Sequence, residues 1–193
     1  WRRYYYVERI HRMAVSPNDK IRLGFIGVAG RGSELLRWFS KHEDVDVTAI
    51  CDLYPEHRQR AIDFVGGTAT GYENFRDLLA DDRVEAVVIA TPPQWHAIMA
   101  TEALQAGKDV YCEKPMCRFP QEGRVMAEFA ERYNRVTQVG TQVHATENYR
   151  KCVNIVRSGI LGKITAVRNY CAMNDESEGL GSPENTPPPD GLD

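Results

Sequence analysis

Short apolar runs alternate with helical patterns along most of the chain, and this alternation constrains the fold more than any other feature of the sequence. We expect strands at Arg22–Ile26, Val45–Cys51, Ala86–Ala90, Asp109–Cys112 and Thr137–Gly140. We expect helices near Ser33–His42, Pro55–Val65, Asn74–Ala80, Gln94–Ala106 and Gln121–Tyr133. Strands that alternate with helices of about 10–15 residues form a parallel sheet with helices on both faces. The run Ala86–Ala90 is apolar throughout, as a central strand buried on both sides requires. The sequence therefore predicts an α/β fold with a doubly wound parallel sheet.

A glycine-rich string, Gly27-Val28-Ala29-Gly30-Arg31-Gly32, follows the first predicted strand and opens the first predicted helix. In a dinucleotide-binding turn, the first glycine permits a tight turn, the second lets the backbone approach the pyrophosphate, and the third allows close packing of helix on strand. Gly27, Ala29 and Gly32 occupy these positions; the methyl group of Ala29 either reduces the closeness of approach or shifts the second role to Gly30. The N–H groups at the helix start, around Arg31, would face the phosphates. The alternative is a tight turn in an unrelated α/β protein.

An acidic residue, Asp52, stands at the end of the second predicted strand. It follows the glycine string by about 20 residues, the distance at which a carboxylate accepts hydrogen bonds from the adenine ribose hydroxyls. Because a carboxylate there repels a 2′-phosphate, the sequence favours NAD over NADP, although Arg31 or Arg58 could weaken that preference. The alternative for Asp52 is a solvated strand end or a helix cap.

Two polar segments directly follow the next two strands of the predicted sheet. Thr91-Pro92-Pro93-Gln94-Trp95-His96 follows Ala90, and Glu113-Lys114-Pro115 follows Cys112. Both segments lie at the carboxyl ends of parallel strands, where open α/β sheets bind ligands. With these segments and the glycine turn, residues 21–170 resemble the glucose–fructose oxidoreductase and inositol dehydrogenase family, whose N-terminal domain is a Rossmann-type sheet.

The resemblance implies one catalytic residue, Lys114, which would hold the substrate hydroxyl and the cofactor ribose beside the nicotinamide and favour loss of the hydroxyl proton as hydride leaves the carbon. It implies that Glu113 contacts the nicotinamide-side ribose, and that Pro115, often cis in the family, sets the turn that directs Lys114. The other cofactor contacts that it implies are Thr91, Pro92, Trp95, His96 and Gln142. The alternatives are an exposed, salt-bridged turn around Lys114 and a packing role for His96 or Trp95.

The chain divides at the sequence level into three parts. Residues 1–20 read as an N-terminal arm, residues 21–141 as the NAD-binding domain, and residues 142–193 as the beginning of an incomplete α+β substrate and oligomerisation domain. In the last part we expect a helix at Asn148–Ser158 and a strand at Ile164–Tyr170. By resemblance the full-length protein is a homo-oligomer, and we expect the 193-residue chain to bind cofactor without turning over substrate.

Composition excludes several classes of partner. Hydrophobic residues make up 42% and charged residues 26% of the chain, and its formal net charge is −3, as in an ordinary globular protein. Neither nucleic acid nor a membrane is the expected partner. The five cysteines lack the spacing of zinc ligands, so we expect no metal, a reducing compartment and a cytoplasmic location. An export signal lost from the N-terminus stays an open alternative.

Three functions fit the sequence. The first is an NAD-dependent dehydrogenase acting on a secondary hydroxyl of a sugar, cyclitol or related polyol. The second is an NAD-dependent glycosidase that oxidises C3, eliminates the aglycone, adds water and reduces the sugar again; the segment Gln142–Thr146 and the proline-rich end resemble that branch. The third is a non-catalytic nucleotide-binding module.

Overall fold

The computed structural model describes residues 20–143 and 146–170 of the 193-residue chain. The chain divides into two compact units, Trp1–Gly140 and Thr141–Asp193. Nearly all of the predicted N-terminal arm, His144 and the proline-rich end lie outside the described residues. Within those residues, no helix is long and apolar enough to cross a membrane.

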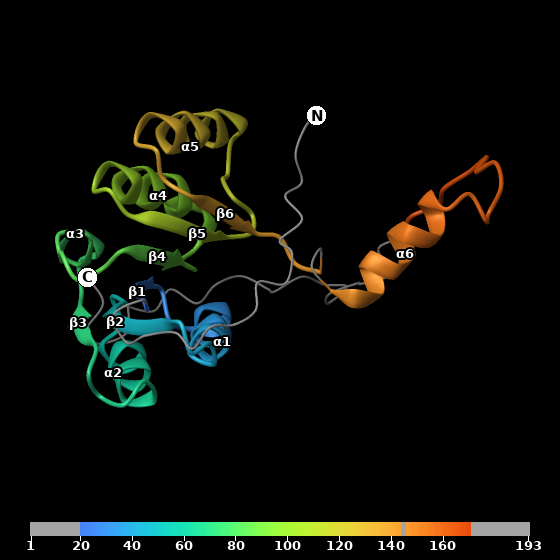
Figure 1. Cartoon of the computed structure of the whole chain (residues 1–193). Coiled ribbons are helices and arrows are strands. Elements are labelled where there is room, and N and C mark those ends of the chain that lie inside the picture. The colour runs from blue at the N-terminus through green and yellow to red at the C-terminus, as the bar shows by residue number, and fades with distance from the viewer. Residues whose placement is uncertain (1–19, 144–145, 171–193) are drawn as a thin grey trace, which may run out of the picture. The chain divides into compact units, whose positions relative to one another are not determined.

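The first unit alternates strands and helices, as the sequence predicts (Figure 1). Its strands are β1 (Ile21–Ile26), β2 (Val45–Cys51), β3 (Thr70–Tyr72), β4 (Ala86–Ile89), β5 (Asp109–Glu113) and β6 (Thr137–Gly140). Its helices are α1 (Gly30–Phe39), α2 (Pro55–Phe64), α3 (Phe75–Leu79), α4 (His96–Gln105), α5 (Pro120–Arg132) and a 3₁₀ turn at Pro93–Trp95.

The strands form one parallel six-stranded sheet in the order β3-β2-β1-β4-β5-β6. This is the strand order of a Rossmann fold, so the predicted doubly wound sheet is confirmed. The apolar strand β4 lies between β1 and β5, and its residues Val87–Ile89 are buried. Because the strand order reverses between β1 and β4, the fold places a crevice at the carboxyl ends of these strands.

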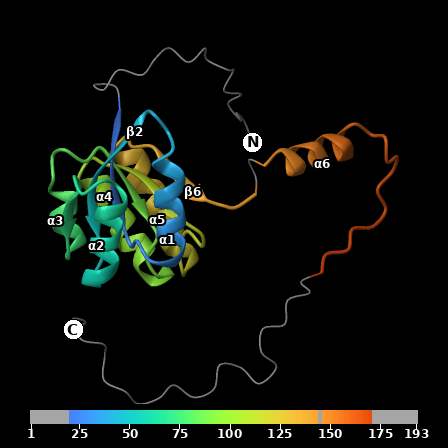
Figure 2. The same ribbon diagram turned by 90° about the horizontal axis from the view of Figure 1, so that it is seen from below.

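The hydrophobic core consists of two clusters on opposite faces of the sheet. One cluster joins Val87 and Ile89 to side chains of α3, α4 and α5, including Leu78, Ala100 and Met126. The other joins Phe25 and Val88 to side chains of α1 and α2. Figure 1 shows α4 and α5 on one side of the strands and α1 and α2 on the other, and Figure 2 shows the same unit after a turn of 90°. Along β4, for example, Val87 and Ile89 belong to one cluster and Val88 to the other, because successive residues of a strand point to opposite faces.

One strand was not predicted from the sequence. The short edge strand β3 has no apolar run, and backbone pairing of Thr70–Tyr72 with Ala49–Cys51 defines it. Hydrogen bonds to a neighbouring strand cannot be inferred from so short a segment.

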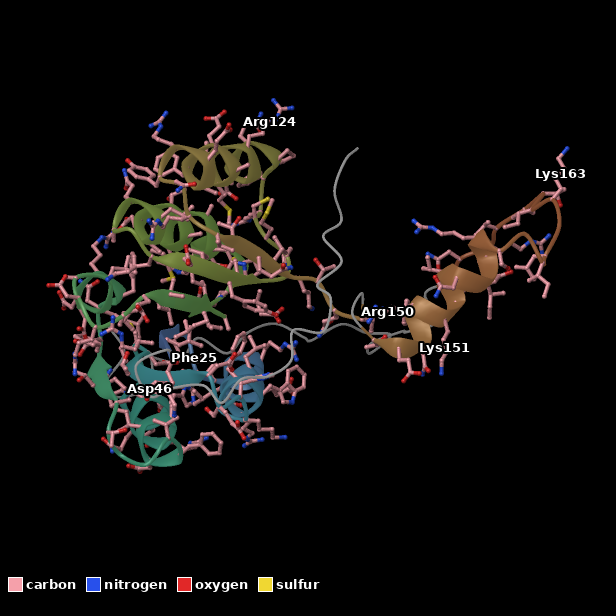
Figure 3. All side chains as sticks on the ribbon, viewed as in Figure 1. Phe25, Asp46, Arg124, Arg150, Lys151 and Lys163 are labelled. Carbon is pink, nitrogen blue, oxygen red and sulfur yellow. The ribbon has the colours of Figure 1, made fainter. Side chains whose placement is uncertain are left out.

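The second unit contains one helix among its described residues, α6 (Glu147–Arg157), where the helical spacing predicts one. The expected strand at Ile164–Tyr170 is wrong, because these residues adopt no regular secondary structure. A strand needs a neighbour to pair its backbone N–H and C=O groups, and no described segment pairs with this one. Apolar side chains of α6, including Tyr149, Val153 and Ile155, are exposed. Arg150 and Lys151 also project from this helix (Figure 3).

Candidate functional site

The turn between β1 and α1 requires glycine at two positions. Gly27 has a φ of +83°, and a Cβ there would lie 3.0 Å from the carbonyl group of Ala90. A Cβ at Gly32 would lie 2.0 Å from the carbonyl oxygen of Gly27, which is far inside van der Waals contact. The chain can therefore turn tightly after β1 and bring α1 onto the strand only without side chains at these positions. These are the packing roles of the first and third glycines in a dinucleotide-binding turn.

The middle of the turn is open. Ala29 is the N-cap residue of α1, and its carbonyl oxygen accepts hydrogen bonds from Gly32 and Ser33. Gly30 has a φ of +37°, and a Cβ at this position would meet no atom within 4 Å. The first N–H groups of a helix have no partner within the helix, and here they belong to Gly30 and Arg31. The start of α1 thus offers free N–H groups beside open space, as a bound phosphate requires.

Asp52 lies directly after β2 and is tied to the glycine turn. One carboxylate oxygen accepts a hydrogen bond from the Val28 N–H at 2.9 Å, and the other accepts one from the Tyr54 N–H, also at 2.9 Å. The His57 imidazole is 3.8 Å from the same carboxylate. The Asp52 side chain is 13% exposed, so it keeps acceptor capacity on the surface of the site. These contacts hold the carboxylate at the rim of the turn.

A cavity of about 550 Å³ opens at the carboxyl ends of β1, β2 and β4. Its volume lies within the usual range of small-molecule sites. Six of the predicted cofactor-binding residues line it: Gly27, Ala29, Asp52, Thr91, Pro92 and Trp95. The structure therefore brings together the glycine turn, the acidic residue and the segment after β4, which are far apart in sequence.

Two arginines close to this site are engaged with protein groups. Arg31 Nε donates to Glu113 at 2.8 Å, and its Nη1 donates to Glu34 at 2.8 Å. The Arg58 guanidinium donates to the carbonyl oxygen of Asp52. Arg31 therefore faces carboxylates in this structure, and the carboxylate of Asp52 lines the cavity. This arrangement agrees with the preference for NAD that the sequence predicts.

A second group of predicted residues surrounds the end of β5. Glu113 is 3% exposed, and its carboxylate accepts hydrogen bonds from Arg31 and from the Lys114 N–H at 2.8 Å. Tyr111 packs nearby, and its pKa is raised by burial and by the charge of Glu113. Lys114 itself is exposed, and no carboxylate in the described part of the chain lies within 4.0 Å of its amine. The Lys114–Pro115 peptide bond is cis.

His96, the first residue of α4, does not line the cavity. It is 1% exposed, with Nδ1 2.7 Å from the carbonyl oxygen of Pro115 and Nε2 2.8 Å from that of Thr91. The ring thus contacts the segments that follow β4 and β5. Gln142 belongs to the second unit, so its predicted contact with the nicotinamide stays a prediction.

Several cavity residues were not predicted from the sequence. They include Leu53, His57, Met99 and the segment Glu73–Arg76 that follows β3. The segment was missed because β3 itself was not predicted. Leu53 carried a signal in the sequence, because it is a large apolar residue directly after Asp52. In the structure its side chain is 61% exposed and contributes to the cavity wall. Among residues 20–143 and 146–170, no group of three or more His, Cys, Asp or Glu side chains is placed to hold a metal ion.

Comparison with known families decides the identity of this unit. The family described as "Oxidoreductase family, NAD-binding Rossmann fold" matches residues 21–141. The chain belongs to this family. Membership confirms the predicted fold, the predicted family and NAD as the cofactor, and the open glycine turn with its neighbouring carboxylate fits that cofactor.

Relatives in the family have different reported activities. The chain is 34% identical over 154 residues to a glycosyl hydrolase family 109 protein of Shewanella baltica, covering 76% of this chain and 34% of that protein. It is 34% identical over 144 residues to the inositol 2-dehydrogenase/D-chiro-inositol 3-dehydrogenase of Lactiplantibacillus plantarum, covering 74% and 41%. The crystal structure of the WlbA dehydrogenase from Bordetella pertussis, in complex with NADH and UDP-GlcNAcA, superimposes with a TM-score of 0.70 at 28% identity, covering 75% and 44%. The chain thus spans less than half the length of these relatives.

Proposed function

We propose that the whole protein is an NAD-dependent dehydrogenase that transfers hydride between nicotinamide and a secondary hydroxyl of a sugar, cyclitol or related polyol. The observation that carries the proposal is the placement of Lys114. It is an exposed amine at the carboxyl end of β5, one residue after a buried carboxylate that pairs with the glycine-turn helix. An amine in this position can exchange a proton with a substrate held beside the cofactor.

The proposal gives each part of the site a role. The N–H groups of Gly30 and Arg31 bind the diphosphate, and Asp52 accepts hydrogen bonds from the adenosine ribose. Bound NAD supplies the hydride acceptor. Lys114 Nζ contacts the nicotinamide-side ribose of the cofactor and holds the substrate hydroxyl. It takes the hydroxyl proton during oxidation and returns a proton during reduction. Glu113 fixes the backbone of Lys114 through its hydrogen bond to the Lys114 N–H.

The substrate class rests on the relatives. An inositol dehydrogenase is among the similar curated proteins, and a dehydrogenase of similar structure was crystallised with a nucleotide sugar. We further propose that residues 21–141 form the NAD-binding domain and that residues 142–193 begin the substrate domain. The extent of the family match and the share of each relative that this chain covers support this division.

A glycosidase is the second candidate, because the Shewanella baltica relative is named as a glycosyl hydrolase. Both candidates use NAD, but they differ in its balance. The dehydrogenase accumulates NADH with a polyol substrate, whereas the glycosidase releases a chromophoric aglycone without net NADH. Both assays, applied to the full-length protein, separate the two activities.

Calorimetric titration of this chain with NAD and NADP tests the cofactor site. We expect NAD to bind more tightly than NADP, and Asp52→Asn to weaken NAD binding by about tenfold, the value of a hydrogen bond to a charged group. Asp46→Asn is the matched control, because Asp46 is an exposed carboxylate on β2, the strand that Asp52 follows (Figure 3). Equal affinity of the two variants, in a chain that is folded, would contradict the assignment of Asp52.

Lys114→Ala and Lys41→Ala form a second matched pair, since both lysines are exposed. In the full-length protein, we expect only Lys114→Ala to abolish turnover, with both variants as stable as the wild type. Turnover that survives Lys114→Ala would refute the proposed role of the amine. If neither the wild type nor the variants oxidise any polyol although NAD still binds, the result would favour a nucleotide-binding module.

A further inference from the structure

One buried side chain, that of His96, connects the segments that follow β4 and β5. His96 begins α4, and its neighbours Ala97 and Ala100 are buried in the core. Its two ring nitrogens lie 2.7 and 2.8 Å from backbone carbonyl oxygens, one of Pro115 and one of Thr91. Thr91 lines the cofactor cavity, and Pro115 directly follows Lys114. A single imidazole at the start of α4 therefore contacts both the cavity wall and the turn Glu113–Pro115, which we call the lysine turn.

The side chain of Lys114 does not help to hold the lysine turn in place. The Lys114 amine has no ion-pair partner in the described part of the chain. Its backbone is held on the N-terminal side, where Glu113 accepts the hydrogen bond of the Lys114 N–H. On the C-terminal side, the carbonyl oxygen of Pro115 is held by Nδ1 of His96. The backbone that carries the amine is thus held by two contacts, one on each side of Lys114.

We propose that His96 is a positioning residue: its protonated Nδ1 donates a hydrogen bond to the carbonyl oxygen of Pro115 and thereby fixes the turn that carries Lys114. A carbonyl oxygen only accepts hydrogen bonds, so each of the two short ring contacts is a hydrogen bond only when that nitrogen is protonated. The contact of Nδ1 with Pro115 is the one that bears on the turn carrying Lys114, and the proposal assigns a proton to this nitrogen. The role goes beyond the cofactor contact that the resemblance implies, since the buried ring does not line the cavity. It rests on the proposed function of Lys114.

The protonation of the ring is tested first, on the unmodified chain. Long-range ¹H–¹⁵N correlation spectra of the histidine rings distinguish a protonated from a bare Nδ1. We expect a protonated Nδ1 in His96. A bare Nδ1 would overturn the proposal without any substitution and without added cofactor.

Two conservative variants then separate the two ring contacts. The amide of His96→Asn takes the place of Nδ1 and can still donate to Pro115, whereas the longer amide of His96→Gln takes the place of Nε2 and reaches toward Thr91. We expect the carbonyl ¹³C shift of Pro115 to stay near its wild-type value in His96→Asn and to change in His96→Gln. An unchanged Pro115 signal in His96→Gln would overturn the proposal.

A binding cycle with NAD tests whether the residue acts through Lys114. We expect His96→Gln to weaken NAD binding about fivefold, the value of one hydrogen bond, while His96→Asn binds within about twofold of wild type. In a Lys114→Ala background, the two His96 variants should bind NAD equally, because the group that they position is gone. A merely structural role would instead give the same loss in both backgrounds, and this outcome would overturn the proposal.

These readouts distinguish a failure of the positioning role from a failure of the proposed function. If Lys114→Ala binds NAD as tightly as the wild-type chain, the proposed place of Lys114 at the cofactor fails, and with it the positioning role of His96. The ring and carbonyl spectra would still report whether the bond to Pro115 exists. If NAD binding responds to Lys114→Ala but the Pro115 bond is absent, the positioning role alone fails.

Discussion

Replacement of Gly32 by alanine should displace the start of α1 from the glycine turn. The structure allows the resulting loss in the free energy of unfolding to be estimated. The added Cβ would lie 2.0 Å from the carbonyl oxygen of Gly27, and ordinary contacts begin at 3.4 Å. The start of α1 must therefore move by more than an ångström, and the atom in its way is backbone that cannot rotate aside. Overpacking lowers the free energy of unfolding by up to about 3 kcal/mol, and the higher helix propensity of alanine raises it by about 1 kcal/mol. We expect a net loss of about 2 kcal/mol in the free energy of unfolding.

Gly123→Ala is the control for this substitution. Gly123 is also a buried glycine inside a helix, but a Cβ there would meet the flexible end of Met116 at 2.7 Å. We expect its free energy of unfolding to stay within about 1 kcal/mol of wild type, because Met116 can change rotamer. Urea denaturation followed by circular dichroism measures both variants, and calorimetry should show that only Gly32→Ala loses more than about tenfold in NAD affinity. Equal stability and equal NAD affinity of the two variants would refute the packing argument.

Two further predictions concern titratable groups. Burial raises the pKa of the Cys51 and Cys112 thiols to about 12; at pH 8 we expect an alkylating reagent to modify the exposed Cys152 and to spare these two, as measured by mass spectrometry, and rapid modification of Cys112 in the folded chain would contradict the burial. The Arg83 guanidinium beside Asp81 holds the pKa of that carboxyl well below its usual range. A carboxyl with a lowered folded-state pKa stabilises the fold above its unfolded pKa of about 4, and this contribution is lost as the pH falls further. The stability difference between wild type and Asp81→Asn should therefore shrink between pH 5 and pH 2, and a constant difference would argue against the ion pair.

Much of the fold followed from the sequence because the βαβ rhythm is local. A fully apolar run such as Ala86–Ala90 has only one place in a parallel sheet, and a glycine string that joins a strand to a helix marks a tight turn. Strands defined by pairing were less predictable. Thr70–Tyr72 is a strand only because Ala49–Cys51 lies beside it, and Ile164–Tyr170 has strand-like composition without a described partner. The sequence could not reveal whether a neighbouring strand lies beside either segment.

In the candidate site, too, local features were predictable from the sequence and long-range contacts were not. The glycine turn and Asp52 are set by spacing along the chain, and the structure places both on one cavity. Contacts between distant segments were not predictable. The hydrogen bond from Arg31 to Glu113 joins residues 82 positions apart, and His96 spans two loops through backbone carbonyls that leave no mark in the sequence. The phosphate contact expected of the backbone N–H groups around Arg31 stays a prediction, whereas the pairing of the Arg31 side chain with Glu113 could not be inferred from the sequence.

The separation of the core into two clusters has a consequence for how this domain can be redesigned. The cluster beneath α1 and α2 includes Val28 and Leu35, next to the glycine turn, while the cluster beneath α4 and α5 packs against Met116 and Cys117, next to the lysine turn. Substitutions in clusters that share no partners usually have additive effects on stability. Stabilising substitutions can therefore be selected separately in the two clusters and combined afterwards, provided that they do not fall on adjacent residues of one strand, such as Val87 and Val88.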